Sequence, residues 1–84
     1  MKIRFTDNDY FTHTIEPYTK YKDKDEREFL IIDMHDDEVN GYVWLVNLST
    51  EEQKQIHLET FKRYVENKLL ERVPPQTAGQ LKAA

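Results

Sequence analysis

Apolar and polar residues alternate along the first part of the chain. The alternation is clear within residues 2–6 and again within residues 10–15. The run Asp7-Asn8-Asp9 between these segments has a composition typical of a turn. Because successive side chains of a strand point to opposite faces, the pattern predicts two short strands joined by a turn.

Two compact apolar runs follow, over residues 29–34 and 42–48. Both are rich in β-branched and aromatic side chains and are too short for helices, so they predict the central strands of a sheet. Residues 16–28, which precede them, contain Pro17 and closely spaced charges of both signs without an apolar period. This composition predicts a solvent-exposed loop.

The connection between the two central strands allows two registers. Asn40-Gly41 favours a two-residue type I′ turn, but that turn would place the carboxylates of residues 36–38 opposite the apolar residues 43–45. A longer loop over residues 35–41 builds one continuous apolar face, and burial generally decides register. We therefore expect the longer loop, which gives the pairs Leu30–Val46, Ile32–Trp44 and Met34–Tyr42.

The second half of the chain carries the signature of a long helix. Ser49, followed three residues later by Glu52, matches the capping box that satisfies free amides in the first turn of a helix. Pro74 ends the helical pattern. Helical spacing places five apolar residues on one stripe, namely Leu58, Phe61, Val65, Leu69 and Val73. The sequence therefore predicts an amphipathic helix over residues 50–73.

Together these elements predict an α+β fold. Its three- or four-stranded antiparallel sheet, arranged as a meander, is followed by one long C-terminal amphipathic helix packed on one face. A chain of 84 residues has room for one modest core. We expect residues 1–73 to form a single domain and residues 74–84, which lack an apolar period, to form a mobile tail.

This arrangement would leave apolar surface in two places. The helix would extend beyond its sheet, because a helix of this length spans about 36 Å and a strand only about 24 Å. The overhang would present Leu69, Leu70 and Val73. The sheet face away from the helix would present Phe29, Ile31, Val43 and Leu45. Either the loop of residues 16–28 folds across this face, or these seven residues bind a partner protein or a second copy of the chain.

Composition limits the cellular compartments and the classes of partner that we expect for this chain. The chain has no cysteine, no apolar run near the roughly 18 residues of a membrane span, and no signal-peptide-like stretch at its beginning. These features favour a soluble cytoplasmic protein. Of the net charge of −4, residues 1–40 contribute −5 (11 acidic, 6 basic) and residues 41–84 contribute +1 (5 acidic, 6 basic). This balance disfavours direct nucleic-acid binding and leaves basic surfaces of other proteins open as partners.

Acidic residues gather at the end of the first apolar run, where His35 lies among Asp33, Asp36, Asp37 and Glu38. Their spacing matches no complete ligand set for a divalent cation, so we expect neither a metal site nor a cofactor. The same carboxylates, displayed on a sheet, could imitate DNA phosphates and occupy the basic groove of a nucleic-acid-binding protein.

The sequence shows no catalytic constellation. The three histidines, at positions 13, 35 and 57, fall on different predicted elements, and two glycines leave no phosphate-binding loop. We therefore expect a small non-enzymatic protein-binding module, for example an inhibitor of the kind that phages and mobile elements make against a host protein. The two alternatives are an acidic DNA mimic and a homodimeric structural or adaptor protein.

Overall fold

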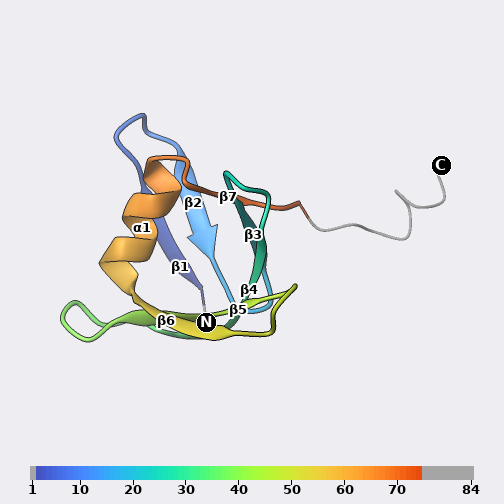
Figure 1. The fold of residues 1–84 in the computed structure, drawn as a ribbon. Helices are drawn as coiled ribbons and strands as arrows, with labels where there is room; N and C mark the ends of the chain where they lie inside the picture. Colours follow the sequence, from blue (N-terminus) through green and yellow to red (C-terminus); the bar gives the residue numbers. More distant parts are fainter. Residues whose placement is uncertain (1, 75–84) are drawn as a thin grey trace, which may run out of the picture.

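The computed structural model describes residues 2–74 and is built mostly of antiparallel strands (Figure 1). The C-terminal tail expected over residues 74–84 lies, apart from Pro74, outside the described residues. The elements are β1 (Ile3–Thr6), β2 (Thr12–Ile15), β3 (Lys20–Asp23), β4 (Glu28–His35), β5 (Tyr42–Asn47), β6 (Gln53–His57), α1 (Leu58–Glu66) and β7 (Leu70–Arg72). Strands β1 and β2 form one antiparallel pair, and the other five form a sheet in the order β6-β5-β4-β3-β7.

The predicted long C-terminal helix is wrong. Ser49 and Glu52 belong to the turn between β5 and β6, and the helix that follows β6 has only nine residues. The side chain of Asn47 directs this turn, since its Oδ1 accepts the amide N–H groups of Ser49 and Thr50 at 2.8 and 3.2 Å. Glu51 adopts a left-handed conformation with φ 64°, which a helix does not allow. The apparent capping box is thus part of the β5–β6 turn, in which the Glu51 amide N–H donates to the Asn47 carbonyl at 2.7 Å.

Helix α1 is capped by His57 at its start and by Asn67 at its end. The His57 Nδ1 accepts the amide N–H of Glu59 at 3.3 Å, and the Asn67 amide N–H donates to the carbonyl of Arg63 at 2.9 Å. Lys68 then turns the chain with φ 60°, and the next residues become β7, which pairs with β3. The chain thus returns to the sheet where the sequence predicted further helix. The helical stripe is correct only for its first three residues, Leu58, Phe61 and Val65, which are buried.

The central strands lie where the sequence predicts them, but their register shifts halfway. Leu30 pairs with Val46 as expected, whereas Trp44 pairs with Asp33 and Tyr42 with His35. The cause is a β-bulge at residue 32, which puts one extra residue into β4. The extra residue changes the phase of the alternation, so that Ile31 and Met34 are both buried and Asp33 is exposed.

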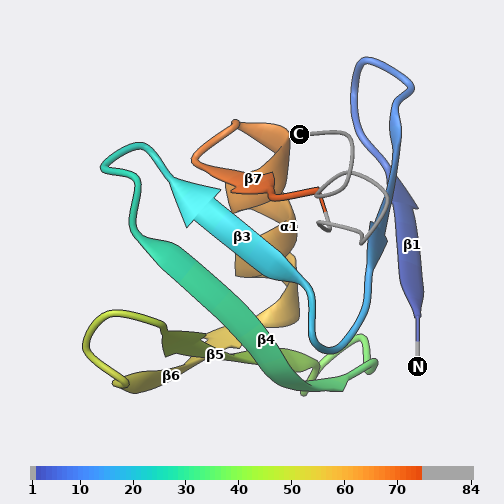
Figure 2. The same ribbon diagram turned by 90° about the vertical axis from the view of Figure 1, so that its right-hand side faces the viewer.

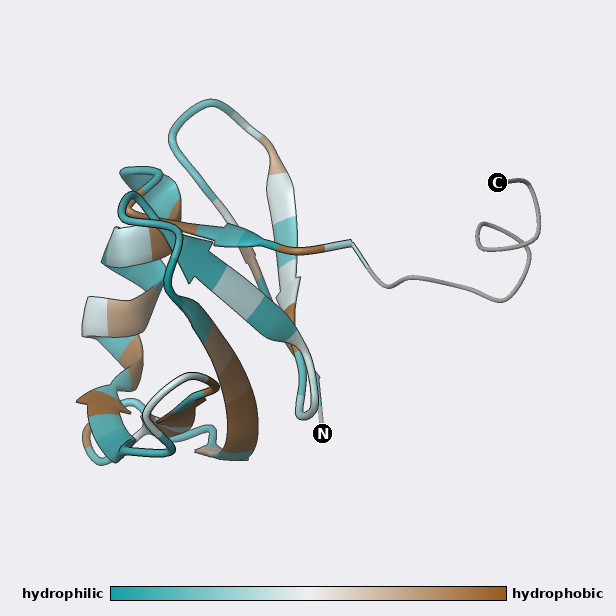
Figure 3. Ribbon diagram, turned by 45° about the vertical axis from the view of Figure 1, so that its right-hand side comes forward, coloured by the Kyte–Doolittle hydropathy of each residue, from teal (hydrophilic) through white to brown (hydrophobic). Residues whose placement is uncertain are grey.

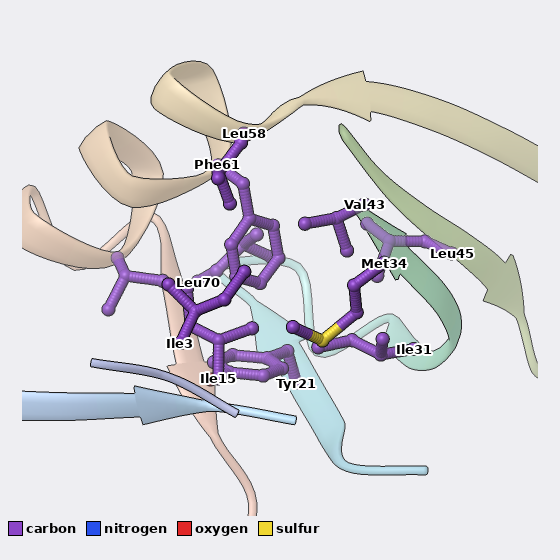
Figure 4. Close-up of a cluster of buried hydrophobic side chains, with 11 residues drawn as sticks. Ile3, Ile15, Tyr21, Ile31, Met34, Val43, Leu45, Leu58, Phe61 and Leu70 are labelled. Carbon is purple, nitrogen blue, oxygen red and sulfur yellow. The ribbon is translucent and has the colours of Figure 1, made fainter. Parts of the chain in front are cut away.

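The hydrophobic core lies on the sheet face that the sequence analysis expected to be open. Figure 4 shows the ring of Phe61, from α1, directed toward Val43 and Met34 of the sheet. Tyr21 packs edge-on against Phe61 with ring centroids 5.1 Å apart. The buried apolar residues are Ile3, Ile15, Tyr21, Ile31, Met34, Val43, Leu45, Leu58, Phe61, Val65 and Leu70. Residues 16–28 are therefore not a loop covering the sheet, because they contribute β3 and the buried Tyr21 to it.

The opposite face of the sheet is not covered by the helix. Its apolar residues remain partly exposed, and β4 carries a long apolar stretch (Figure 3). By the alternation of the paired strands, this outer face includes Leu30, Ile32, Trp44 and Val46. The structure thus exchanges the two faces relative to the prediction, since the helix packs on the face of Val43 and Leu45.

Candidate functional site

A cleft of about 670 Å³ opens on the inner side of the sheet, beside the helix. In Figure 2 the β3–β4 and β5–β6 turns extend to the same side of the molecule. Residues of both turns contribute to the cleft, together with residues of α1 and of the segment leading into β7. Its lining residues are Asp23, Arg27, Phe29, Leu45, Asn47, Glu52, Gln53, Lys54, Ile56, Tyr64, Leu69 and Leu70.

The floor of the cleft consists of apolar side chains of the inner face. They are accessible because the helix is too short to cover the whole of that face. Nine residues of helix span roughly 13 Å, whereas β4 alone has eight residues and spans about 26 Å. Phe29, Ile56 and Tyr64 are only partly buried, and the side chain of Leu69 is 39% exposed. These four side chains border the cleft without filling it.

One rim of the cleft is a braced ion pair in the β3–β4 turn. Arg27 Nε donates to Asp23 Oδ2 at 2.8 Å, and Asp23 Oδ1 accepts the amide N–H groups of Asp25 and Arg27, each at 2.9 Å. Although partial burial acts in the opposite direction, the amide and guanidinium of Arg27 hold the pKa of Asp23 below its usual range. Asp23 therefore stays ionised and fixes the Arg27 side chain at the rim.

The other rim comes from the β5–β6 turn and β6, and it carries Glu52 and Lys54. Both residues are exposed, and neither forms an ion pair with another described residue. The cleft thus combines an apolar floor with charges of both signs that are available to a partner. Its volume is within the range of about 300–1,000 Å³ typical of ligand sites, and the described residues that line it include no histidine, serine, threonine or cysteine.

The structure brings together four of the seven apolar residues that the sequence proposed for partner binding. Phe29, Leu45, Leu69 and Leu70 line the cleft, although Leu45 and Leu70 are themselves buried. Ile31 and Val43 are fully buried in the core, so they cannot meet a partner. Val73 lies beyond β7, where its amide N–H donates to the Lys20 carbonyl at 2.9 Å, and it borders a separate pocket of about 510 Å³.

The other eight lining residues were not predicted as partner-binding, among them Arg27, Lys54, Ile56 and Tyr64. Arg27 was assigned to a solvent-exposed loop, and Lys54, Ile56 and Tyr64 to one continuous helix. A usable signal was present in the turns, because Asp7-Asn8-Asp9 and Asp23-Lys24-Asp25 share the pattern Asp-x-Asp. In both, the first aspartate accepts the amide N–H groups two and four residues later.

Four turns of the described chain begin with an Asp or Asn whose side chain accepts backbone amide N–H groups of the turn. Asp7, Asp23, Asp37 and Asn47 each accept two backbone amide N–H groups through Oδ1. This Asx arrangement stabilises turns without glycine. Among the four carboxylates that raised the possibility of DNA mimicry, Asp37 is therefore engaged in local structure.

The acidic cluster after the first apolar run is spread over a strand end and a turn. The amide N–H groups of Asn40 and Val39 donate to Asp37 and lower its pKa, with His35 acting in the same direction, whereas partial burial opposes them. The hydroxyl of Tyr42 donates to Asp33 Oδ2 at 3.4 Å. Asp36 and Glu38 are exposed. Within residues 2–74, no group of three or more histidine or carboxylate side chains is placed to hold a metal ion.

A second pair of titratable groups lies on the β1–β2 hairpin. His13 Nε2 is 2.7 Å from Asp7 Oδ2, and the His13 ring stacks on Phe5 with centroids 5.0 Å apart. Lys62 of α1 lies 5.8 Å from the centroid of the Phe5 ring. These contacts link the β1–β2 hairpin to α1. The Asp7–His13 pair therefore has a structural role in the described part of the chain.

Comparisons with known proteins do not relate this site to a known one. The helix of the described chain is neither long nor apolar enough to cross a membrane. No family model, curated protein or solved structure matches the chain.

Proposed function

We propose that this chain is a small non-enzymatic module that binds another protein through the cleft. The observation that carries the proposal is the combination of an apolar floor, formed in part by Phe29, Ile56, Tyr64 and Leu69, with a charged rim. Partly exposed apolar residues that converge in one concavity are typical of sites that receive an apolar side chain of a partner. Burying one leucine side chain there would contribute about 1.5–3 kcal/mol.

The rim supplies the specificity of such a contact. Arg27 is held in place by Asp23, so it offers a positioned donor with little loss of side-chain entropy on binding. Lys54 and Glu52 face the same concavity from the opposite side. A module of this kind acts as an inhibitor when the surface that it covers on its partner is an active site or a binding groove.

Two leucines offer a matched test of this proposal. Leu69 lines the cleft and is 39% exposed, whereas Leu48 is 41% exposed and does not line it. Proteins captured from native lysate by the wild-type chain should be lost with Leu69→Asp and retained with Leu48→Asp, when circular dichroism shows that both variants are folded. The proposal fails if both variants retain the same captured proteins, or if both lose them equally.

A further inference from the structure

We propose that the partner segment is an extended strand that adds to the free edge of β6 and places alternate side chains in the cleft. This inference rests on the proposed function and specifies the binding mode. It follows from three features of β6: the direction of its backbone groups, the position of its side chains and the charge of Lys54.

The backbone of β6 has an unused hydrogen-bonding edge. The amide N–H of Asn47 donates to the Glu52 carbonyl at 2.8 Å, and that of Leu58 donates to the Gly41 carbonyl at 2.9 Å. Hydrogen-bonded pairs alternate along an antiparallel ladder, so Lys54 and Ile56 also direct their backbone groups toward β5. Gln53 and Gln55 therefore direct theirs outward, where no other described residue bonds to them.

The free edge also forms a wall of the cleft. Lys54 pairs with the buried Leu45, and Ile56 pairs with the buried Val43, so both side chains of β6 lie on the inner face of the sheet. An added strand would continue this face, and every second side chain would lie on its cleft side, next to Lys54 and Ile56. The five residues of β6 would pair with a segment of about 16 Å.

Lys54 and Ile56, the two inner-facing residues of β6, define which side chains the partner strand should carry opposite them. Lys54 has no ion-pair partner among the described residues, so a carboxylate directly across the new ladder would be complementary. Ile56 favours an apolar side chain at the position opposite to it. The partner strand should therefore carry an acidic and an apolar residue separated by one residue, in the order apolar-x-acidic if it runs antiparallel to β6.

Other exposed edges of the described sheets fit less well. Strand β7, at the opposite edge of the main sheet, has three residues, and β1 and β2 have four each. A second copy of the chain would bring another lysine and no carboxylate to the ladder at β6, because β6 itself contains no acidic residue. An acidic, apolar strand of another protein is thus the complementary occupant.

The probe for this inference is a displayed library of random twelve-residue peptides, selected against the full chain. Peptides enriched on the wild-type protein should show the apolar-x-acidic pattern, or its reverse for a parallel strand. Gln55→Pro removes an outward N–H without breaking the ladder to β5 and should raise the Kd of such a peptide at least tenfold. Gln55→Thr keeps the N–H and should leave the Kd within twofold.

Amide hydrogen exchange gives a second readout that needs no variant. In the free protein the Gln55 amide should exchange much faster than those of Lys54 and Ile56, and saturating peptide should slow it at least tenfold. Slow exchange of Gln55 that depends on protein concentration without peptide would instead identify a second copy as the occupant and overturn the inference.

The remaining outcomes separate the two proposals. If Leu69→Asp weakens peptide binding and the two Gln55 variants bind alike, the cleft function stands and strand addition is wrong. Enrichment of peptides with apolar residues at helical spacing would also show that strand addition is wrong while the cleft function stands. If neither Leu69→Asp nor Gln55→Pro weakens binding, or if no peptide is enriched, both proposals fail.

Discussion

Ile31 and its neighbour Ile32 lie on opposite faces of the main sheet, one fully buried against the helix side and the other partly exposed on the outer face. Ordinary alternation along the strand creates this difference, and the bulge at residue 32 then directs Met34 to the inner face. The burial of these two identical side chains, consecutive in one strand, thus indicates which face of the sheet carries the core.

The first prediction uses this pair of isoleucines. Ile31→Ala should lower the free energy of unfolding by about 2–5 kcal/mol, because it leaves a cavity in the core. Ile32→Ala should cost clearly less, since its side chain already contacts water. Urea denaturation of both variants measures the difference. Equal losses would show that the outer face is covered as completely as the inner one.

The second prediction concerns the start of α1. His57 accepts the Glu59 amide through Nδ1 and donates from Nε2 to the Val39 carbonyl at 3.0 Å, so one imidazole joins the helix to the β4–β5 turn. His57→Ala should cost about 0.5–2 kcal/mol of stability in urea denaturation, as expected for a lost N-cap.

His57→Asn is the matched control for this position. Asparagine is a strong N-cap residue but is too short to replace the imidazole contact with Val39. It should recover most of the stability that His57→Ala loses. If both variants are equally destabilised, the contact with Val39, and not the cap, is the stabilising interaction.

The third prediction is a pH dependence at the β1–β2 hairpin. The hydrogen bond from His13 lowers the pKa of Asp7, partial burial opposes it, and the amides of Phe11 and Asp9 add to the lowering. A carboxyl whose pKa is lower in the folded state stabilises the protein above its unfolded pKa of about 3.9, and this contribution disappears as the pH falls through the folded value. Wild type should therefore exceed Asp7→Asn in thermal midpoint near neutral pH, and the difference should shrink on acidification.

A His13→Phe background tests whether the imidazole is responsible. Phenylalanine keeps an aromatic ring against Phe5 and removes the hydrogen bond to Asp7. In this background Asp7→Asn should have a smaller effect on the thermal midpoint, because the two residues are coupled. An unchanged effect would assign the lowered pKa to the backbone amides of the turn.

The positions of β1, β2, β4 and β5 could be predicted because apolar residues mark them directly in the sequence. Strand β6 could not, since it is an edge strand whose segment Gln53–His57 contains a single apolar residue and is exposed on both faces. With no strand signal there, the capping-box pattern at Ser49 and the real stripe of α1 merged into one apparent helix. Tertiary pairing with β5 overrides that local preference.

The cleft was only partly predictable for the same reason. Four of its apolar residues, among them Leu69 and Phe29, were predicted as surplus surface, whereas Ile56 and Tyr64 were not. Which surplus residues remain accessible depends on the bulge in β4 and on the early end of α1. Periodicity alone specifies neither feature, because a bulge changes the phase of a strand without a distinctive residue at Ile32.

The pairing of β7 with β3 determines when folding can be completed. Leu70 belongs to the core, yet its strand pairs with residues about 50 positions earlier in the chain, including Asp23. Contacts over such distances carry a large loop-closure entropy and tend to form late. During synthesis, the outer edge of β3 therefore stays unpaired until Arg72 has left the ribosome, and the nascent chain depends on its last described strand to add Leu70 to the core.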